Sequence, residues 1–208
     1  MKDPPEVKAL LLDADWVIQR IPPDWVSYIE RLIDPDTDKK SFLIEIFEAE
    51  GQCMTGQADF EVELSKVLTR WGSKVHADEA ARIWHKILPD PDILRCIREL
   101  RSAGELVCLA TNQHDYRYRF MANELGYGQM FDYLFASCEM GVAKPSKLYF
   151  VKICQQLNLS ASNLLFIDDV AENVESARSC GLIAERFHLI ENQGEFEKIL
   201  SKYNFNAE

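Results

Sequence analysis

The chain has 208 residues, of which 47% are hydrophobic and 27% are charged. This composition is typical of a globular protein, and the length fits one domain or one domain that carries a sizeable insertion. Thirty-four acidic residues against 23 basic ones leave a net charge of −11. We therefore expect no broad contact with nucleic acid and no attachment to an anionic membrane, because both need a cationic surface.

No apolar stretch approaches the roughly 18 residues that a membrane-spanning helix needs. The first residues also lack a secretory pattern, because proline and acidic residues interrupt them. The six cysteines are widely spaced and form no CxxC pair: Cys53, Cys96, Cys108, Cys138, Cys154 and Cys180. This usage favours reduced core thiols in a cytoplasmic protein.

Short apolar runs alternate with longer segments of helical periodicity, which predicts an α/β fold. Strands are expected at 7–12, 106–110, 133–136, 164–167 and 182–187. Helices are expected between them, with apolar positions at Ile93, Ile97 and Leu100, at Leu148, Val151 and Leu157, and at Val174 and Ala177. Gly104 and Asn158 follow two of these helices as stop signals.

Residues 17–88 contain no convincing strand and are predicted to form four helices. The clearest pattern is an amphipathic series at Phe60, Leu64, Val67, Leu68 and Trp71. We therefore expect a helical insertion directly after the first strand, within a core built from 1–16 and 89–208.

Asp13 and Asp15 stand at the carboxyl end of the first predicted strand. Ligands of open α/β sheets collect at that end, so the two carboxylates are candidates to flank a metal or to share nucleophilic and acid/base roles. The alternative is a strand that ends in an Asx-type turn, which is common.

Three further groups follow at corresponding places of the chain. Thr111 and Asn112 end the second strand, and Asp168 and Asp169 end the fourth. Adjacent carboxylates after an apolar run are costly unless a cation compensates them. Lys144 precedes a proline and a helix, from where its side chain can return to the acidic site. Taken singly, each group also fits a helix cap or a surface turn.

In this order the strings DADWV, ATN, GVAKPSKLYF and IDDVAENVESARSCG resemble the haloacid dehalogenase (HAD) superfamily, in the form with a helical cap of the C1 type. The chain is most similar to the branch of sugar-phosphate phosphatases and the amino-terminal phosphatase domain of soluble epoxide hydrolases. The resemblance implies a Rossmann-like parallel sheet of strand order 5-4-1-2-3, with the cap inserted at 17–88.

The resemblance also implies a Mg²⁺-dependent phosphatase acting on a small phosphorylated metabolite. Asp13 would be the nucleophile that forms an aspartyl-phosphate, and Asp15 the general acid and base. Lys144 would hold Asp13 and the transferring group together, while Thr111 and the Asn112 amide would bind phosphoryl oxygens. The metal ligands implied are the Asp13 carboxylate, the Asp15 main-chain carbonyl and Asp169, with Asp168 as a further ligand or a partner of the ligands.

Residues 15 and 16 help to choose between a phosphatase and other activities of the same family. Related dehalogenases typically carry an aromatic residue where this chain has Asp15, so phosphate chemistry is favoured over dehalogenation. A phosphomutase would use the same residues. Trp16 stands where the family usually has glycine, in a conformation that tryptophan adopts only with strain. We expect Trp16 to line the substrate pocket, and an impaired enzyme that only binds ligands stays an alternative.

The segment HDYRYR, residues 114–119, is locally basic and aromatic. In a chain with a net charge of −11 it is interpreted as the start of a surface helix, with His114 exposed. The sequence predicts neither the substrate nor the oligomeric state.

Overall fold

The computed structural model describes residues 6–192 and 194–205; residues 1–5, 193 and 206–208, which belong to the predicted core, lie outside the described residues. The central sheet contains five parallel strands: β1 (Ala9–Leu12), β4 (Val107–Thr111), β5 (Tyr133–Ala136), β6 (Leu164–Asp168) and β7 (Ile183–Arg186). Their order is β5-β4-β1-β6-β7. Numbered within this sheet alone and taken from the β7 edge, the order is 5-4-1-2-3, so the predicted fold class is confirmed.

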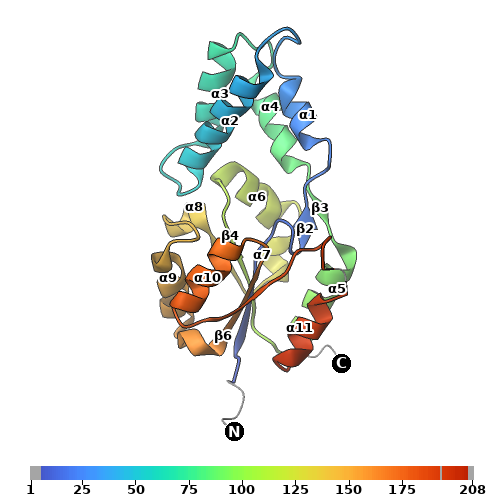
Figure 1. The fold of residues 1–208 in the computed structure, drawn as a ribbon, viewed down its shortest axis with the longest axis vertical. Coiled ribbons are helices and arrows are strands. Elements are labelled where there is room, and N and C mark those ends of the chain that lie inside the picture. Colours follow the sequence, from blue (N-terminus) through green and yellow to red (C-terminus); the bar gives the residue numbers. More distant parts are fainter. Residues whose placement is uncertain (1–5, 193, 206–208) are drawn as a thin grey trace.

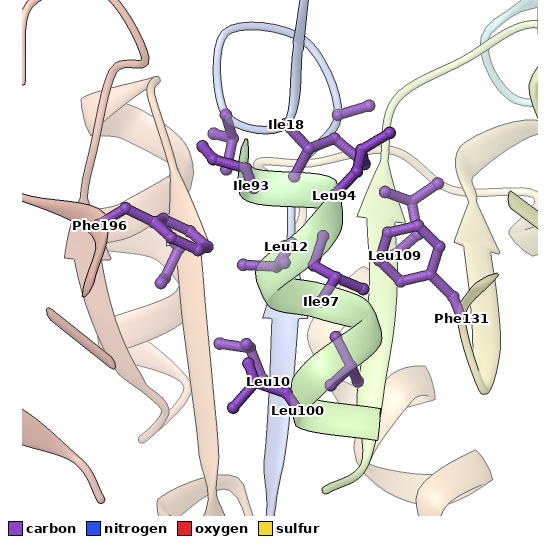
Figure 2. Close-up of a cluster of buried hydrophobic side chains, with 14 of the residues drawn as sticks. Leu10, Leu12, Ile18, Ile93, Leu94, Ile97, Leu100, Leu109, Phe131 and Phe196 are labelled. Atoms are coloured by element: carbon purple, nitrogen blue, oxygen red, sulfur yellow. The ribbon is translucent and has the colours of Figure 1, made fainter. Parts of the chain in front are cut away.

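Helices cover both faces of the sheet (Figure 1). On one face α5 (Pro91–Ser102), α7 (Tyr127–Met130) and α11 (Phe196–Lys202) pack over Leu10 and Leu12. Figure 2 shows α5 lying over β1, and Ile97 and Leu100 of this helix belong to the same buried cluster as Leu10 and Leu12. On the other face α9 (Lys147–Leu157) and α10 (Ala171–Ser179) cover Ala9 and Leu11. Because side chains alternate along a strand, β1 supplies both halves of the core.

Local signals explain where these helices begin and end. The Asp90 side chain accepts hydrogen bonds from the Asp92 and Ile93 amides, and Pro91 occupies the first turn of α5. Gly104, with a φ of +91°, follows that helix. For α9 the predicted apolar face is wrong, because Leu148 and Val151 are exposed. The buried face instead carries Tyr149, Phe150 and Ile153.

The helices between residues 25 and 85, here called the helical layer, lie beyond the carboxyl ends of the strands (Figure 1). They are α1 (Trp25–Glu30), α2 (Lys39–Cys53), α3 (Phe60–Arg70), α4 (Ala77–Ala81) and the 3₁₀ helix η1 (Arg82–His85). They bury a hydrophobic cluster of their own around Phe42, Phe60 and Trp84. The four helices agree with the expectation for this segment, while the exact domain limits stay a prediction.

Two short strands correct the expectation that residues 17–88 contain none. β2 (Gln19–Arg20) pairs antiparallel with β3 (Leu88–Pro89) in a separate ribbon. The two chain segments that connect the sheet to the helical layer run side by side here, so their backbones pair. A two-residue strand is too short for sequence periodicity to show it.

The remaining helices are α6 (Asp115–Asn123), which follows β4, α8 (Ser137–Met140), which follows β5, and the 3₁₀ helix η2 (Ala161–Asn163), which precedes β6. All six cysteines belong to the described residues and carry free thiols, of which only Cys53 and Cys108 are fully buried. Within the described ranges, no helix is long and apolar enough to cross a membrane.

Candidate active site

The carboxyl ends of β1, β4 and β6 bring the predicted site residues together. Asp13 follows β1, and Asp168 ends β6, the strand that pairs directly with β1. Lys144, which precedes α9, reaches both: its Nζ lies 2.9 Å from Oδ1 of Asp13 and 2.6 Å from Oδ2 of Asp168. The same Nζ donates to the Ala110 carbonyl at 2.8 Å. Lys144 is therefore a buried cation held at the centre of the site.

Three carboxylates converge around this lysine. Oxygens of Asp13, Asp168 and Asp169 lie within 4.8 Å of one another. Burial raises the pKa of Asp13 to about 7, although Lys144 acts to lower it. Burial, with the charge of Asp168 adding to it, raises the pKa of Asp169 to about 6. One lysine leaves two of the three negative charges uncompensated, so the donor set fits a divalent cation that prefers carboxylate oxygens.

The paired acids differ in their surroundings. Asp168 is fully buried and accepts hydrogen bonds from the Asn173 side chain at 3.0 and 3.1 Å and from the Val170 amide at 2.8 Å. Asp169 is only partly buried. The donors around Asp168 fix its orientation, whereas Asp169 keeps more of its oxygens free for a ligand.

The Asp15 carboxylate lies apart from this cluster and is paired with Arg117. Nη2 of Arg117 donates to Oδ1 at 2.8 Å, and Nη1 donates to Oδ2 at 2.5 Å. Gln19 donates to Oδ1 at 3.0 Å, and Gln113 donates to Oδ2 at 3.1 Å. Burial acts to raise the pKa of Asp15, but the charge and hydrogen bonds of Arg117 outweigh it and hold this pKa below its usual value.

Arg117 and Gln113 are site residues that sequence reasoning missed, and the interpretation of 114–119 as an exposed surface helix is wrong for its first turn. His114 is fully buried and stacks on Phe60 of the helical layer, with ring centroids 3.9 Å apart. Arg117 is also buried and donates from Nε to the Trp84 carbonyl at 3.1 Å. The helical layer covers this turn. One sequence signal could have found these residues. They directly follow the strand that ends in the predicted phosphoryl-binding residues, so they start close to the site.

Thr111 and Asn112 occupy the end of β4 as expected. Thr111 is buried, and its Oγ1 lies 3.4 Å from Nε2 of Gln113. The Asn112 side chain instead holds the lysine loop: Nδ2 donates to the Lys144 carbonyl at 2.8 Å, and Oδ1 accepts from the Lys144 amide at 2.9 Å. The side chain of Asn112 thus positions Lys144, and phosphoryl binding by the Asn112 amide stays a prediction.

Residues 10–181 match the family model of the haloacid dehalogenase-like hydrolases. The chain belongs to this family. Sesquiterpene phosphatase astK of Aspergillus oryzae is 30% identical over 95 residues, which are 46% of this chain and 48% of that protein. Phosphatase MT3486 of Mycobacterium tuberculosis is 29% identical over 127 residues, which are 60% of this chain and 57% of that protein. The match thus spans about half the length of these curated relatives.

Solved structures of haloacid dehalogenase-like proteins share the fold. The HAD family enzyme BT-2542 of Bacteroides thetaiotaomicron superimposes with a TM-score of 0.80 at 19% identity, covering 94% of this chain and 98% of that chain. Its complex with magnesium and inorganic phosphate gives a TM-score of 0.76 at 20% identity, covering 91% and 98%. The L-2-haloacid dehalogenase of Xanthobacter autotrophicus gives 0.64 at 19% identity, covering 96% and 84%.

Trp16, directly after Asp15, has a backbone conformation that is unusual for tryptophan. Its φ of +62° lies in the left-handed region that favours glycine. The indole stacks on His188, with ring centroids 5.2 Å apart and an interplanar angle of 13°. The Trp16 carbonyl accepts from the Leu189 amide at 2.6 Å. These contacts hold tryptophan in a strained conformation directly after Asp15.

Proposed function

We propose that the protein is a Mg²⁺-dependent phosphatase that hydrolyses a small phosphate monoester through an aspartyl-phosphate on Asp13. The observation that carries the proposal is the convergence of Asp13, Asp168 and Asp169, two of which pair with Lys144. Two relatives are phosphatases by name, and BT-2542 has been solved with magnesium and phosphate. An acidic cluster with one lysine suits an anionic substrate only when a further cation is bound.

The carboxylates of Asp13 and Asp169 and the Asp15 main-chain carbonyl would hold the metal, with Asp168 as a further ligand or as a partner that orients them. A bound Mg²⁺ would neutralise charge on the nucleophile and on the phosphoryl group, which otherwise repel each other. Lys144 forms an ion pair with Oδ1 of Asp13, and we assign the attack on phosphorus to the other oxygen, Oδ2. Thr111 would contribute a hydroxyl donor to a phosphoryl oxygen.

The reaction would proceed in two displacements. Oδ2 of Asp13 forms a bond to phosphorus as the bond to the leaving oxygen breaks. Asp15 takes up a proton from water beforehand, giving up one of its accepted hydrogen bonds, and passes this proton to the leaving oxygen. Asp15 then takes a proton from water as the water oxygen attacks phosphorus and releases Asp13. The helical layer, placed beyond the strand ends, would act as a cap that excludes bulk water and selects the substrate.

The test is phosphate release from an aryl phosphate and from a panel of metabolite phosphates. Each substrate is assayed with Mg²⁺, with chelator and with the D13N variant, and D36N serves as the matched control because Asp36 is exposed on the helical layer. We expect release that requires both the metal and Asp13 and that D36N leaves unchanged. Release that survives D13N or the chelator, or halide release from a 2-haloacid without any phosphate release, would overturn the proposal.

A further inference from the structure

The Asp15 carboxylate has all of its acceptor positions occupied. An ionised carboxylate offers about four such positions, two on each oxygen. Oδ1 accepts from Gln19 and Arg117, and Oδ2 accepts from Gln113 and Arg117. The amide groups of the two glutamines are themselves held, since Gln19 accepts from the Tyr127 hydroxyl at 2.9 Å and Gln113 accepts from Arg117 at 3.0 Å. Asp15 therefore sits in one defined orientation.

Arg117 joins this carboxylate to the helical layer. Its Nη atoms bind Asp15, while its Nε donates to the main-chain carbonyl of Trp84 in η1. The Trp84 indole in turn donates to the Glu50 carboxylate of α2 at 2.8 Å. A guanidinium is planar and presents its donors in a fixed fork, so one rigid group spans the catalytic loop and the layer above it. Movement of η1 relative to the sheet acts directly on the orientation of Asp15.

We infer that Arg117 is a positioning residue that orients Asp15 for proton transfer and couples this orientation to the helical layer through the Trp84 carbonyl. The inference rests on the proposed role of Asp15. Arginine supplies only donors, so it cannot itself relay a proton. When Asp15 takes up a proton for a leaving oxygen, or accepts a hydrogen bond from the attacking water, one of the four donors gives way, and the remaining bonds keep the carboxyl group aligned.

The test compares leaving groups. An alkyl phosphate needs a proton on its leaving oxygen, whereas a nitrophenyl phosphate releases an anion that is stable without one. For R117K, which keeps the charge but loses the two-pronged fork, we expect the single-turnover rate of alcohol release from an alkyl phosphate to fall by about 10- to 100-fold, within the range of general acid–base effects. On nitrophenyl phosphate we expect the single-turnover rate of nitrophenolate release to fall by less than about threefold, because the later attack of water, which also needs Asp15, does not enter this rate. KM for both substrates should change little, because Arg117 acts through Asp15.

A second variant separates positioning from folding. In R117A, added guanidinium ion at millimolar concentration should restore part of the alkyl phosphatase activity, which it cannot do for a misfolded protein. R119K on the same helix is the control, because Arg119 is surface exposed and pairs with Asp115. Folded R117K with unchanged single-turnover rates, or an equal loss of these rates on both substrates with no rescue of R117A, overturns the inference. Failure of the wild type to release phosphate from any substrate, or full activity of D13N, instead contradicts the proposed function.

Discussion

Asp13 is buried beside Lys144, and its pKa of about 7 is well above the value of about 4 of an exposed aspartate. A carboxyl group whose pKa is higher in the folded state binds its proton more tightly there. The contribution of Asp13 to the free energy of unfolding of the metal-free protein therefore falls as the pH rises from about 4 to about 7. The Asp13 carboxylate thus costs stability under the conditions in which it is ionised.

We expect the D13N variant to lack this decrease in unfolding free energy with rising pH, because asparagine does not ionise. In the presence of chelator, the unfolding free energy of D13N should exceed that of the wild type by about 1–3 kcal/mol at about pH 8, with the difference vanishing near pH 4. Lys144 keeps Asp168 as a partner in this variant. Urea unfolding at both pH values measures the effect, with D36N as the matched control. If D13N were less stable than the wild type at pH 8, the ionised Asp13 carboxylate would not be destabilising, which would contradict its raised pKa.

Trp16 offers a second test at single-residue resolution. W16G relieves a left-handed backbone that costs a non-glycine residue about 1 kcal/mol, but it removes the stack on His188, worth about 0.5–1.5 kcal/mol. We expect these effects to offset each other, so that W16G changes the unfolding free energy by less than about 1 kcal/mol. H188A removes the stack and leaves the strain, so denaturant unfolding should show it to be the less stable variant. The opposite order would show that the strain is absent.

The candidate site divides into residues that sequence motifs predict and residues that only the assembled molecule reveals. Asp13, Thr111 and Asp168 follow or end buried strands, and parallel strands bring their ends together without further information. Arg117 is different. Arg117 is buried because the helical layer packs over it and accepts a hydrogen bond from its Nε. The sequence of α6 alone does not predict where that layer lies.

At the scale of elements, the loop between α2 and α3 meets α8. Gly56 in this loop has a φ of +70°, and a Cβ built on it would lie 2.3 Å from the Cys138 carbonyl oxygen. A side chain cannot fit there unless the backbone moves. Gly72, which follows α3, has a φ of +65° but no atom within 4 Å of a Cβ. The two glycines have the same backbone conformation, but only Gly56 lies against a neighbouring backbone atom.

G56A should therefore separate the loop from α8, whereas G72A should show only the strain of its positive φ. We expect the unfolding free energy of G56A to fall by about 1–2 kcal/mol more than that of G72A, in the range of overpacked sites. If the helical layer acts as a cap, KM for the phosphate substrate should rise in G56A alone. Equal losses of stability in the two variants would show that the contact contributes nothing.

Element prediction succeeds where an amphipathic period persists over several turns. The series from Phe60 to Trp71 predicts α3, which the structure places at Phe60–Arg70. It fails where packing chooses between two apolar faces, as in α9, where the sheet buries the aromatic pair Tyr149 and Phe150 rather than Leu148. The β2–β3 ribbon depends on two segments about 70 residues apart in the chain, so neither strand carries a local signal.

At the scale of the whole molecule, the sheet and the helical layer bury separate hydrophobic clusters. They meet through the β2–β3 ribbon and through polar or aromatic contacts of α6, including the stack of His114 on Phe60. The net charge of −11 is opposed locally by Lys144 and Arg117, which pair with the buried acids of the site. The predicted metal would complete this compensation.

Metal binding should therefore stabilise the whole fold, and the effect should depend on pH. A ligand that binds only the folded state raises the melting temperature, and protons compete with it at Asp13 and Asp169, whose pKa values are about 7 and about 6. We expect millimolar Mg²⁺ to raise the melting temperature clearly at about pH 8 and little at about pH 5, because both carboxylates are largely protonated at the lower pH. D169N should lose the shift while D36N keeps it. An equal shift at both pH values, or a shift that survives D169N, would place the metal on other groups.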